Sequence, residues 1–399
     1  MKLLSISPVV PSTKNAHAGG RVFYFYASKL CKEAEIDYSL LVFCKKKDSL
    51  TFDLDTKNKR FIFTSGTIIS SFSHFFYDYI IGRKYSLIHY SLFKQKKVIS
   101  YLKHLKRVKN LPDVIQLEWT EMVYFAPQIK KLFPSIRIIA TEHDVTFLAA
   151  YRKASLNPQN KTLKKRYELV KSVELKALSC CDVIMPFNEK DKALLLENGI
   201  PNNKIFVLTP FFHSMLDVVR KPSTKDILFW GAMNRPENYE AAEWFIIHVM
   251  PLLKTEGVRF IAAGNNPPKS LVAYASDRIV VTGFINDETS LFEKSLCFVA
   301  PLLTGAGIKI KVLEALSSGI PVLTNDIGIE GINAVDGESF FFCKTPEDYA
   351  NVIGLLLAGT INIEKMELSQ KDFVRNGFEM EKSYSQYLSL IKRFNYEKE

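Results

Sequence analysis

Short apolar runs alternate with amphipathic helical stretches along most of this chain of 399 residues. Strand–helix alternation of this kind predicts an α/β protein with parallel, doubly wound sheets, whose functional groups lie where the strands end. The chain is long enough for two such domains. The strands predicted in the first half are residues 3–7, 39–43, 114–118, 136–141, 183–187 and 204–208, and those in the second half are 226–230, 259–263, 279–282, 296–301, 321–324 and 339–343.

A segment without clean periodicity, residues 209–225, separates the two sets of strands and contains Pro210 and Pro222. We interpret it as the linker between two Rossmann-like domains. Two such domains with a cleft between them are suited to hold a nucleoside diphosphate against a second substrate. The predicted domains are residues 1–208 and 226–375, followed by a C-terminal helix, 376–399, that is expected to pack back on the first domain.

The apolar stretch that opens the chain is short, and Pro8 and Pro11 interrupt it, so we interpret residues 3–7 as a buried strand rather than a signal peptide. No uncharged run approaches the roughly 18 residues that are needed to span a bilayer. The six cysteines have no zinc-like spacing and are interpreted as small buried side chains in a reducing compartment. The chain is therefore expected to be cytoplasmic.

A net charge of +11 favours an anionic partner, which could be nucleic acid, a phosphate-bearing substrate or a membrane surface. Residues 64–110 combine a cluster of aromatic residues at 72–80 with a predicted basic helix at 90–109. Three interpretations of this helix remain open: a surface helix packed on its own domain, a face that rests on anionic lipid, and a nucleic-acid-binding element. Its lysines include Lys96, Lys97, Lys103 and Lys106.

The strongest local signal is a glycine-rich segment that follows the predicted strand 296–301. Gly305 and Gly307 allow a tight turn into a helix predicted to run from Ile308 to Ser318, and Gly319 ends that helix. A glycine-rich entry into a helix N-terminus offers free N–H groups and a positive dipole end to a diphosphate.

Three charged side chains belong to the same helix. Lys309 and Lys311 add two positive charges in its first turn. Glu314 lies further along and is able to accept hydrogen bonds from ribose hydroxyls; the alternative is that it only pairs with one of the lysines. The segment therefore predicts a site for a nucleotide diphosphate.

The sequence Gly305-Ala-Gly-Ile-Lys-Ile-Lys-Val-Leu-Glu314, followed by Gly319-Ile-Pro-Val322, resembles the donor-binding motif of retaining GT-B glycosyltransferases of family 4. It is similar in particular to a bacterial polysaccharide-associated subgroup of that family. The family has two glutamates separated by seven residues; Glu314 matches the second, and Ala306 stands where the first would be. The resemblance implies that Glu314 binds the donor ribose and that Gly305, Gly307, Ile308, Lys309 and Lys311 contact the donor.

The resemblance extends to other strand ends in the same order along the chain. Gly19 and Gly20 match a glycine pair that brings an N-terminal loop close to the donor phosphates, and residues 113–122 match a strand-and-turn segment. Thr141-Glu-His-Asp-Val145 matches a histidine motif, which implies that His143 contacts the transferred sugar. Asp144 either orients His143 or caps the next helix.

Three further matches lie in the second half. The segment Gly231-Ala-Met-Asn-Arg-Pro236 implies that Arg235 reaches the pyrophosphate. Gly264 and the segment Thr282-Gly-Phe-Ile-Asn-Asp287 match two strand-end turns. In the second of these turns the backbone of Phe284 would meet the nucleobase, with core packing as the alternative.

The resemblance implies transfer of a sugar from a nucleotide-sugar donor with retention at the anomeric carbon. The departing phosphate oxygen would take the proton of the acceptor, while His143, Lys309, Lys311 or Arg235 and the helix N-terminus act on the sugar and the leaving diphosphate. Neither a metal nor a cofactor is implied. The first domain would take the acceptor, a saccharide or a lipid-linked one, in polysaccharide, lipopolysaccharide or glycoconjugate biosynthesis.

A peripheral position at the inner face of the membrane would suit a lipid-linked acceptor, and nucleic acid is not an expected partner. Two rival interpretations remain: a GT-B epimerase or phosphorylase, and a GT-B protein that binds a nucleotide sugar or a lipid without catalysis. Ala306 and the basic aromatic segment keep the second rival open.

Overall fold

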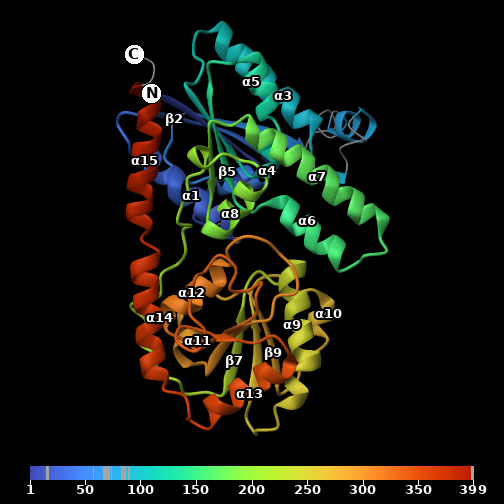
Figure 1. Cartoon of the computed structure of the whole chain (residues 1–399), viewed down its shortest axis with the longest axis vertical. Coiled ribbons are helices and arrows are strands. Elements are labelled where there is room, and N and C mark those ends of the chain that lie inside the picture. Colours follow the sequence, from blue (N-terminus) through green and yellow to red (C-terminus); the bar gives the residue numbers. More distant parts are fainter. Residues whose placement is uncertain are drawn as a thin grey trace. The chain divides into compact units, whose positions relative to one another are not determined.

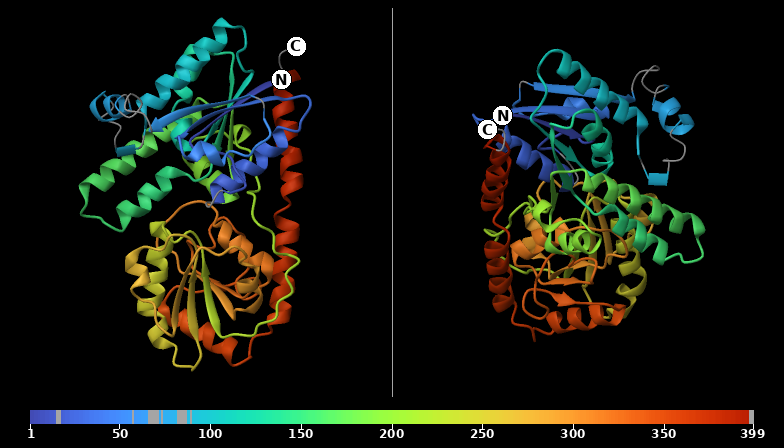
Figure 2. Two further views of the ribbon diagram at one scale, coloured as in Figure 1. Left: turned by 180° about the vertical axis from the view of Figure 1, so that it is seen from behind. Right: turned by 45° about the horizontal axis from the view of Figure 1, so that its top comes forward.

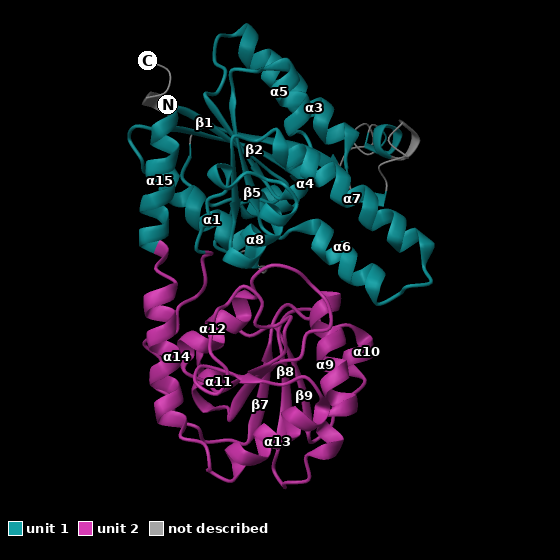
Figure 3. Cartoon of the chain, in the orientation of Figure 1, with its two compact units in different colours: residues 1–209, 381–399 teal, residues 210–380 magenta. Residues whose placement is uncertain are grey.

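The computed structural model describes residues 1–14, 18–56, 58–65, 72, 74–81, 87–88 and 90–396 (Figure 1). The chain divides into two compact units (Figure 3). Unit 1 consists of Met1–Thr209 with Glu381–Glu399, and unit 2 consists of Pro210–Met380. The predicted linker, 209–225, contains no helix or strand, and the unit boundary falls near its start.

Unit 1 is built on a sheet of six parallel strands in the order β3-β2-β1-β4-β5-β6. The first strand in sequence, β1, lies in the middle and pairs with both β2 and β4, so the strand order reverses between β1 and β4. In a doubly wound sheet, loops on the two sides of such a reversal diverge and leave room for a ligand. The strands are β1 (Lys2–Ser7), β2 (Asp37–Lys45), β3 (Asn58–Ser65), β4 (Val114–Glu118), β5 (Arg137–Glu142) and β6 (Val183–Pro186).

Helices lie on both sides of this sheet (Figures 1 and 2). Short polar side chains set several helix starts, because they accept hydrogen bonds from the backbone N–H groups of the first turn: Ser91 for α3, Asn160 for α7 and Asn188 for α8. The helices are α1 (Ala18–Leu30), α3 (Leu92–Arg107), α4 (Thr120–Val123), α5 (Ala126–Leu132), α6 (Thr146–Ser155), α7 (Lys161–Ser179), α8 (Glu189–Glu197) and α15 (Met380–Tyr396), with the short turns η1 (Asp48–Thr51), η2 (Phe76–Ile81) and η4 (Asn202–Lys204).

Unit 2 repeats this plan with a sheet in the order β12-β11-β10-β7-β8-β9, which reverses between β7 and β10. Helices α9 and α10 lie on one side of the sheet and α11, α12 and α14 on the other (Figure 1). The elements are β7 (Asp226–Trp230), α9 (Pro236–His248), η5 (Met250–Leu252), β8 (Arg259–Ala263), α10 (Lys269–Val272), β9 (Ile279–Gly283), α11 (Thr289–Lys294), β10 (Cys297–Ala300), α12 (Ile310–Ser318), β11 (Val322–Thr324), β12 (Phe341–Phe342), α13 (Pro346–Leu357) and α14 (Ile363–Gly377).

The predicted α/β architecture with two parallel sheets is confirmed, but one predicted strand was wrong and one strand was missed. Residues 204–208 lie beside β6, with Phe206 N donating to Ile184 O and Leu208 N to Pro186 O, yet they form only an isolated bridge. Pro186 has no N–H to return the bond, so the ladder cannot continue. The missed strand is β3, whose sequence opens with the polar residues Asn58, Lys59 and Arg60.

No helix in the described part of the chain is long and apolar enough to cross a membrane.

Candidate functional site

The strand-end loops of unit 2 pack backbone against backbone. Gly231 N donates to Ala263 O at 3.0 Å and Gly264 N donates to Gly283 O at 3.1 Å, so β7, β8 and β9 are held together just beyond their ends. A Cβ on Gly264, which has φ +146°, would lie 1.7 Å from the carbonyl oxygen of Gly231. Only glycine fits at residue 264, because any side chain would clash with the backbone of Gly231.

The glycine-rich loop after β10 leads into α12 as the sequence indicates. Gly305 and Gly307 both have positive φ, +119° and +70°, and Gly319 ends the helix at φ +77°. The helix begins at Ile310, two residues later than predicted, because Lys309 is the N-cap with φ −93° and ψ 92°. Ile308 therefore belongs to the loop. The N-terminus of α12 lies next to β7, across the strand-order reversal of this sheet.

The side chain of Lys309 folds back over its own loop. Its Nζ donates to Ala306 O at 3.1 Å and to Gly307 O at 2.5 Å, and it forms an ion pair with Glu330 Oε2 at 3.5 Å. The carboxylate of Glu330 is fully buried. The ammonium is thus held at the mouth of the glycine-rich turn, where a diphosphate oxygen would be a competing ligand.

Lys311 points from α12 towards the end of β7. Its Nζ donates to Asn238 Oδ1, lies 4.9 Å from the centre of the Phe229 ring, and would be 3.1 Å from a Cβ on Gly231. Burial lowers the pKa of Lys311 to about 7, and the neighbouring charges of Glu237 and Arg235 act in opposite directions. The site therefore contains a lysine whose charge changes near neutral pH.

Glu314 is buried, and its Oε1 accepts the backbone N–H of His213 at 3.2 Å. Ser317, one turn later, accepts the N–H of Met215 through its hydroxyl at 2.9 Å. These two bonds fasten residues 213–215 to α12. Glu314 begins the second turn of the helix, because α12 starts at Ile310.

Two predicted donor contacts lie further out. Arg235 is the N-cap of α9, and its half-exposed guanidinium pairs with Glu237. Phe284 follows β9 and is 69% exposed, so the alternative that it packs in the core is wrong. Both residues lie beyond strand ends of the same sheet as Gly231 and Gly264, at the edge where α12 begins.

In unit 1 the structure brings His143 and Gly19 together. The His143 imidazole lies parallel to the indole of Trp119, with ring centroids 3.9 Å apart and 3° between the planes. A Cβ on Gly19 would lie 3.3 Å from His143 Nδ1 and 3.3 Å from Trp119 Cζ2. Gly19 and Gly20 are both in the first turn of α1. The absence of a side chain at residue 19 therefore lets that turn approach the two rings.

This part of the site also contains Glu118 and Trp119, which the sequence did not indicate as site residues. His143 Nε2 lies 3.3 Å from Glu118 Oε2, and both side chains are buried. The backbone of Trp119 has φ +65°, a left-handed conformation that is rare for an aromatic residue. Its ring stacks on the His143 imidazole. In unit 2, Glu330 was missed in the same way. Glu118 and Trp119 belong to the strand-and-turn segment 113–122, which was the only signal that could have indicated them.

Near His143, three buried acidic side chains lie close enough to interact electrostatically: Glu142 in β5, Glu174 in α7 and Asp191 in α8. Glu142 Oε2 accepts the Thr120 hydroxyl at 2.7 Å, while Oε1 is buried with no hydrogen-bond partner among the described residues. Burial raises the pKa of Glu142 to about 8, and Asp144 and Asp191 add to the shift. Glu174 accepts the N–H groups of Thr146 and Phe147, and burial raises its pKa too.

The backbone carbonyl of Asp144 accepts a 3.4 Å hydrogen bond from the Thr120 hydroxyl. Helix α6 starts after Val145, whose side chain provides no cap. Val145, not Asp144, stands at the N-cap position of this helix. The N–H groups of the first turn are bound by Glu174 instead.

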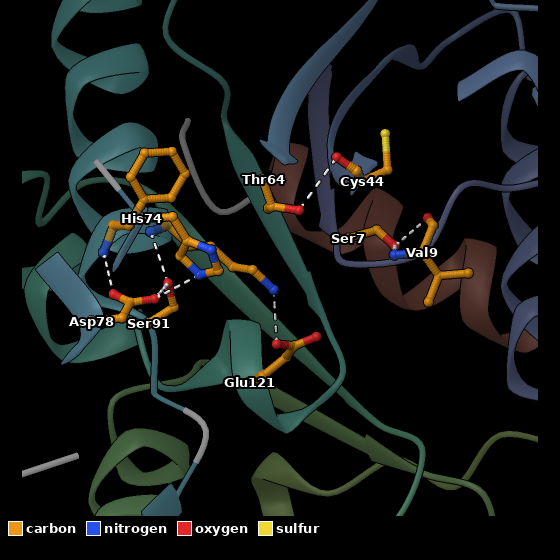
Figure 4. A network of polar contacts seen from close by, with 10 residues as sticks. Ser7, Val9, Cys44, Thr64, His74, Asp78, Ser91 and Glu121 are labelled. Atoms are coloured by element: carbon orange, nitrogen blue, oxygen red, sulfur yellow. Dashed lines mark hydrogen bonds and ion pairs between the residues drawn. The ribbon is translucent and has the colours of Figure 1, made fainter. Parts of the chain in front are cut away.

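The basic helix of the sequence is α3, and Asp78 anchors its first turn (Figure 4). Asp78 accepts from Phe93 N at 2.8 Å and from the Ser91 hydroxyl at 2.5 Å, and it pairs with His74 at 2.9 Å. Lys94 pairs with Glu121 at 3.0 Å. The four lysines of interest are all exposed: Lys96, Lys97, Lys103 and Lys106.

Exposed aromatic rings lie beside the start of this helix. Lys96 Nζ lies 3.9 Å from the centre of the Tyr77 ring. Phe72, Phe75 and Phe76 are exposed, and Phe72 stacks on Phe76. Tyr79 and Ile80 also belong to the aromatic segment, but their side chains lie outside the described residues. The surface formed by these phenylalanines and the α3 lysines is called the α3 surface below.

Comparison with known proteins finds a family match within the second unit. Residues 224–359 match the family described as glycosyl transferases group 1. They contain the strand-end glycines, Arg235, Phe284 and the whole of α12. The chain is also 24% identical over 309 residues to an uncharacterised 44.6 kDa protein in the cps region of Klebsiella pneumoniae, covering 73% of this chain and 77% of that protein.

Solved structures match the fold of the chain. Sucrose-phosphate synthase from Thermosynechococcus elongatus has a TM-score of 0.72 at 14% identity and covers 98% of this chain and 99% of its own. Anabaena HepE in complex with UDP-glucose has a TM-score of 0.70 at 11% identity, covering 98% and 100%. The lipopolysaccharide outer core galactosyltransferase WaaB has a TM-score of 0.63 at 14% identity, covering 98% of this chain and 99% of its own. The family match thus covers residues 224–359 of unit 2, and the whole chain shares the GT-B fold of these solved structures.

Proposed function

We propose that this protein transfers a sugar from a nucleoside diphosphate sugar to a saccharide or lipid-linked acceptor, with retention, in polysaccharide, lipopolysaccharide or glycoconjugate biosynthesis. The observation that carries the proposal is the glycine-rich turn into α12, which places Lys309 and Lys311 beside the strand-order reversal of unit 2. Uridine diphosphate sugars are the first donors to test, because the HepE structures contain UDP and UDP-glucose.

In the proposed step the bond between the anomeric carbon and the diphosphate oxygen breaks, and a bond to the acceptor oxygen forms on the same face. The acceptor proton passes to the departing phosphate oxygen. Lys309, Lys311 and the N–H groups of α12 stabilise the developing negative charge, and preorganised donors of this kind contribute about 3–4 kcal/mol each. Glu314 holds the ribose and His143 contacts the transferred sugar.

Lys309 gives the sharpest test. In the free protein its ammonium already binds the carbonyls of Ala306 and Gly307, so a leaving diphosphate would replace contacts that exist before the reaction. Lys309→Ala should lower kcat about 100-fold or more with a smaller loss of donor affinity. Glu330→Gln is the companion variant, because it removes the partner charge and keeps the lysine.

Equal losses of kcat and affinity would restrict Lys309 to ground-state binding. An unchanged kcat would remove it from the step and leave Lys311 and Arg235 as candidates. The donor base can be found by thermal stabilisation with UDP, ADP and GDP, since a ligand at 100 times its Kd adds about 2.7 kcal/mol.

A protein that binds nucleotide sugar without turnover is the alternative favoured by Ala306, which replaces the first glutamate of the family motif. Release of UDP from UDP-sugars in the presence of candidate acceptors separates the two. Binding with no release under any acceptor condition would support the alternative.

The acceptor side of the proposal rests on the α3 surface. Exposed phenylalanines next to exposed lysines match an anionic lipid boundary, because aromatic rings bury at the headgroup level and lysines near such a surface contribute about 1 kcal/mol each. A lipid-linked acceptor at the inner face of the membrane would bring the enzyme to that surface.

A further inference from the structure

The ring of His143 is held in place by side chains of unit 1. Trp119 stacks on one face, and Phe187 meets the ring at 62° with centroids 5.1 Å apart. Nε2 faces the Glu118 carboxylate at 3.3 Å, while Nδ1 faces the first turn of α1 at Gly19. The imidazole therefore presents its two nitrogens to different surroundings, and what each nitrogen can do depends on where the proton sits.

A carboxylate only accepts hydrogen bonds, so the nitrogen that faces Glu118 must be the donor. In the neutral ring this puts the proton on Nε2 and leaves a lone pair on Nδ1. On the Gly19 side, His143 would then accept a hydrogen bond from a substrate hydroxyl rather than donate one. The orientation of Glu118 decides how strongly this tautomer is favoured.

Glu118 is held by a buried amide. Gln116 Nε2 donates to Glu118 Oε1 at 2.7 Å and to Thr141 Oγ1 at 2.9 Å. Its carbonyl, Oε1, accepts the hydroxyl of Tyr387 at 2.5 Å. Reversing the amide would turn its oxygen towards the carboxylate, which can only accept, so the carboxylate sets the amide orientation. In this orientation the Tyr387 hydroxyl is the donor that holds the amide oxygen in place.

Tyr387 belongs to α15, 271 residues along the chain from Gln116, and its side chain is buried. Its ring packs against Tyr26 at 5.6 Å and Tyr384 at 6.3 Å. The hydroxyl thus reaches the sheet from the C-terminal helix, through an aromatic cluster that fixes its position.

We propose that Tyr387 is a positioning residue, which acts through Gln116 and Glu118 to hold His143 in the tautomer with its proton on Nε2. These four residues form the His143–Tyr387 network. The C-terminal helix then contributes to the chemistry of unit 1 and not only to its packing. The role of His143 towards sugar rests on the proposed function, but the state of its ring does not.

The test uses the full chain labelled with ¹⁵N-histidine, at a pH of about 8.5, where ordinary imidazoles are neutral. The His143 signals are assigned by their loss in His143→Gln. In the unchanged protein Nε2 should give a pyrrole-type shift and Nδ1 a pyridine-type shift. In Tyr387→Phe, which keeps the ring packing, the two shifts should move towards the average of a mixed population.

Tyr384→Phe is the matched control. Its hydroxyl donates to Glu33 at 2.9 Å, away from the His143–Tyr387 network, although the ring belongs to the same helix and the same cluster. This variant should leave both His143 shifts in place. Gln116→Leu breaks the network at a second point, and combining it with Tyr387→Phe should cause no further change.

Unmoved His143 shifts in both Tyr387→Phe and Gln116→Leu would overturn the proposal, as would equal movement in Tyr384→Phe, which would indicate loosened helix packing. A kinetic readout follows with UDP-glucose: Tyr387→Phe should lower kcat for UDP release about tenfold with KM nearly unchanged. Absence of UDP release by the unchanged protein would count against the proposed function and leave the shift measurement intact.

Discussion

The carboxylate of Glu314 accepts the backbone N–H of His213 at 3.2 Å, from a buried position in the second turn of α12. Residues 213–215 carry no regular secondary structure; this bond ties them to the helix, as does the bond from Met215 N to the Ser317 hydroxyl. A residue expected to bind ribose therefore also fixes the segment that enters unit 2. The two roles predict different effects of two substitutions.

Glu314→Ala should lower donor affinity about tenfold and destabilise the protein by about 1 kcal/mol, because the partly buried N–H of His213 loses its acceptor. Glu314→Gln keeps an oxygen for His213, so it should recover stability while its affinity stays reduced. Calorimetric titration with UDP and urea unfolding measure the two quantities. Wild-type affinity in Glu314→Ala would show that the ribose assignment is wrong.

Lys311 should make donor binding depend on pH. Burial lowers its pKa to about 7 in the free protein, so the ammonium is lost as pH rises through that value, and a bound diphosphate favours its return. Donor Kd should therefore rise by up to about tenfold per pH unit above pH 7. Titrations of UDP at several pH values, in buffers of different ionisation enthalpy, would also detect proton uptake.

Lys311→Arg is the control for that prediction, because a guanidinium stays charged over the whole range. Its Kd should vary little with pH. An equally steep profile in Lys311→Arg would assign the pH dependence to another group.

Because of Glu142, the free energy of unfolding should fall as pH rises. Burial raises its pKa from 4.5 to about 8, so between these values the folded state holds a proton that the unfolded state has released. The stabilisation is complete below about pH 4.5 and is lost as pH rises through 8, with a slope of at most about 1.4 kcal/mol per pH unit from this group. Glu142→Gln should flatten the profile of unfolding free energy in urea.

An exposed glutamate of the same unit, Glu197, provides the comparison. Glu197→Gln should leave the profile unchanged. Because Glu174 also carries a raised pKa, part of the slope should survive in Glu142→Gln. An undiminished slope would assign the whole effect to Glu174.

The α3 surface should bind anionic liposomes in a salt-sensitive manner. Changing Lys96, Lys97, Lys103 and Lys106 to glutamate should abolish flotation with anionic vesicles, since each lysine contributes about 1 kcal/mol. The same change at the exposed residues Lys32, Lys45, Lys46 and Lys47 alters the net charge equally and should leave flotation in place. Flotation with neutral and anionic vesicles alike, or with neither, would contradict the proposal.

The sequence by itself determined the α/β class, the two sets of parallel strands and the glycine-rich turn into α12. Periodicity, β-branched runs and turn residues act over a few neighbouring residues, so they can be read without knowing the fold. The same local signals indicated that His143 ends a strand, and that Gly305, Gly307 and Gly319 occupy turns that need positive φ. They failed at β3, whose opening residues are polar, and at residues 204–208, where the ladder depends on Pro186 of another strand.

Tertiary structure alone decided which of these local features meet. Strand order, set by non-local pairing, places the loop after β10 beside β7 and the loop after β4 beside β1. The partner of Lys309 is 21 residues away, and Gln116 and Tyr387 are 271 apart. No local pattern encodes such contacts or the burial that moves the pKa of Lys311, because both depend on how distant side chains exclude water from the same place.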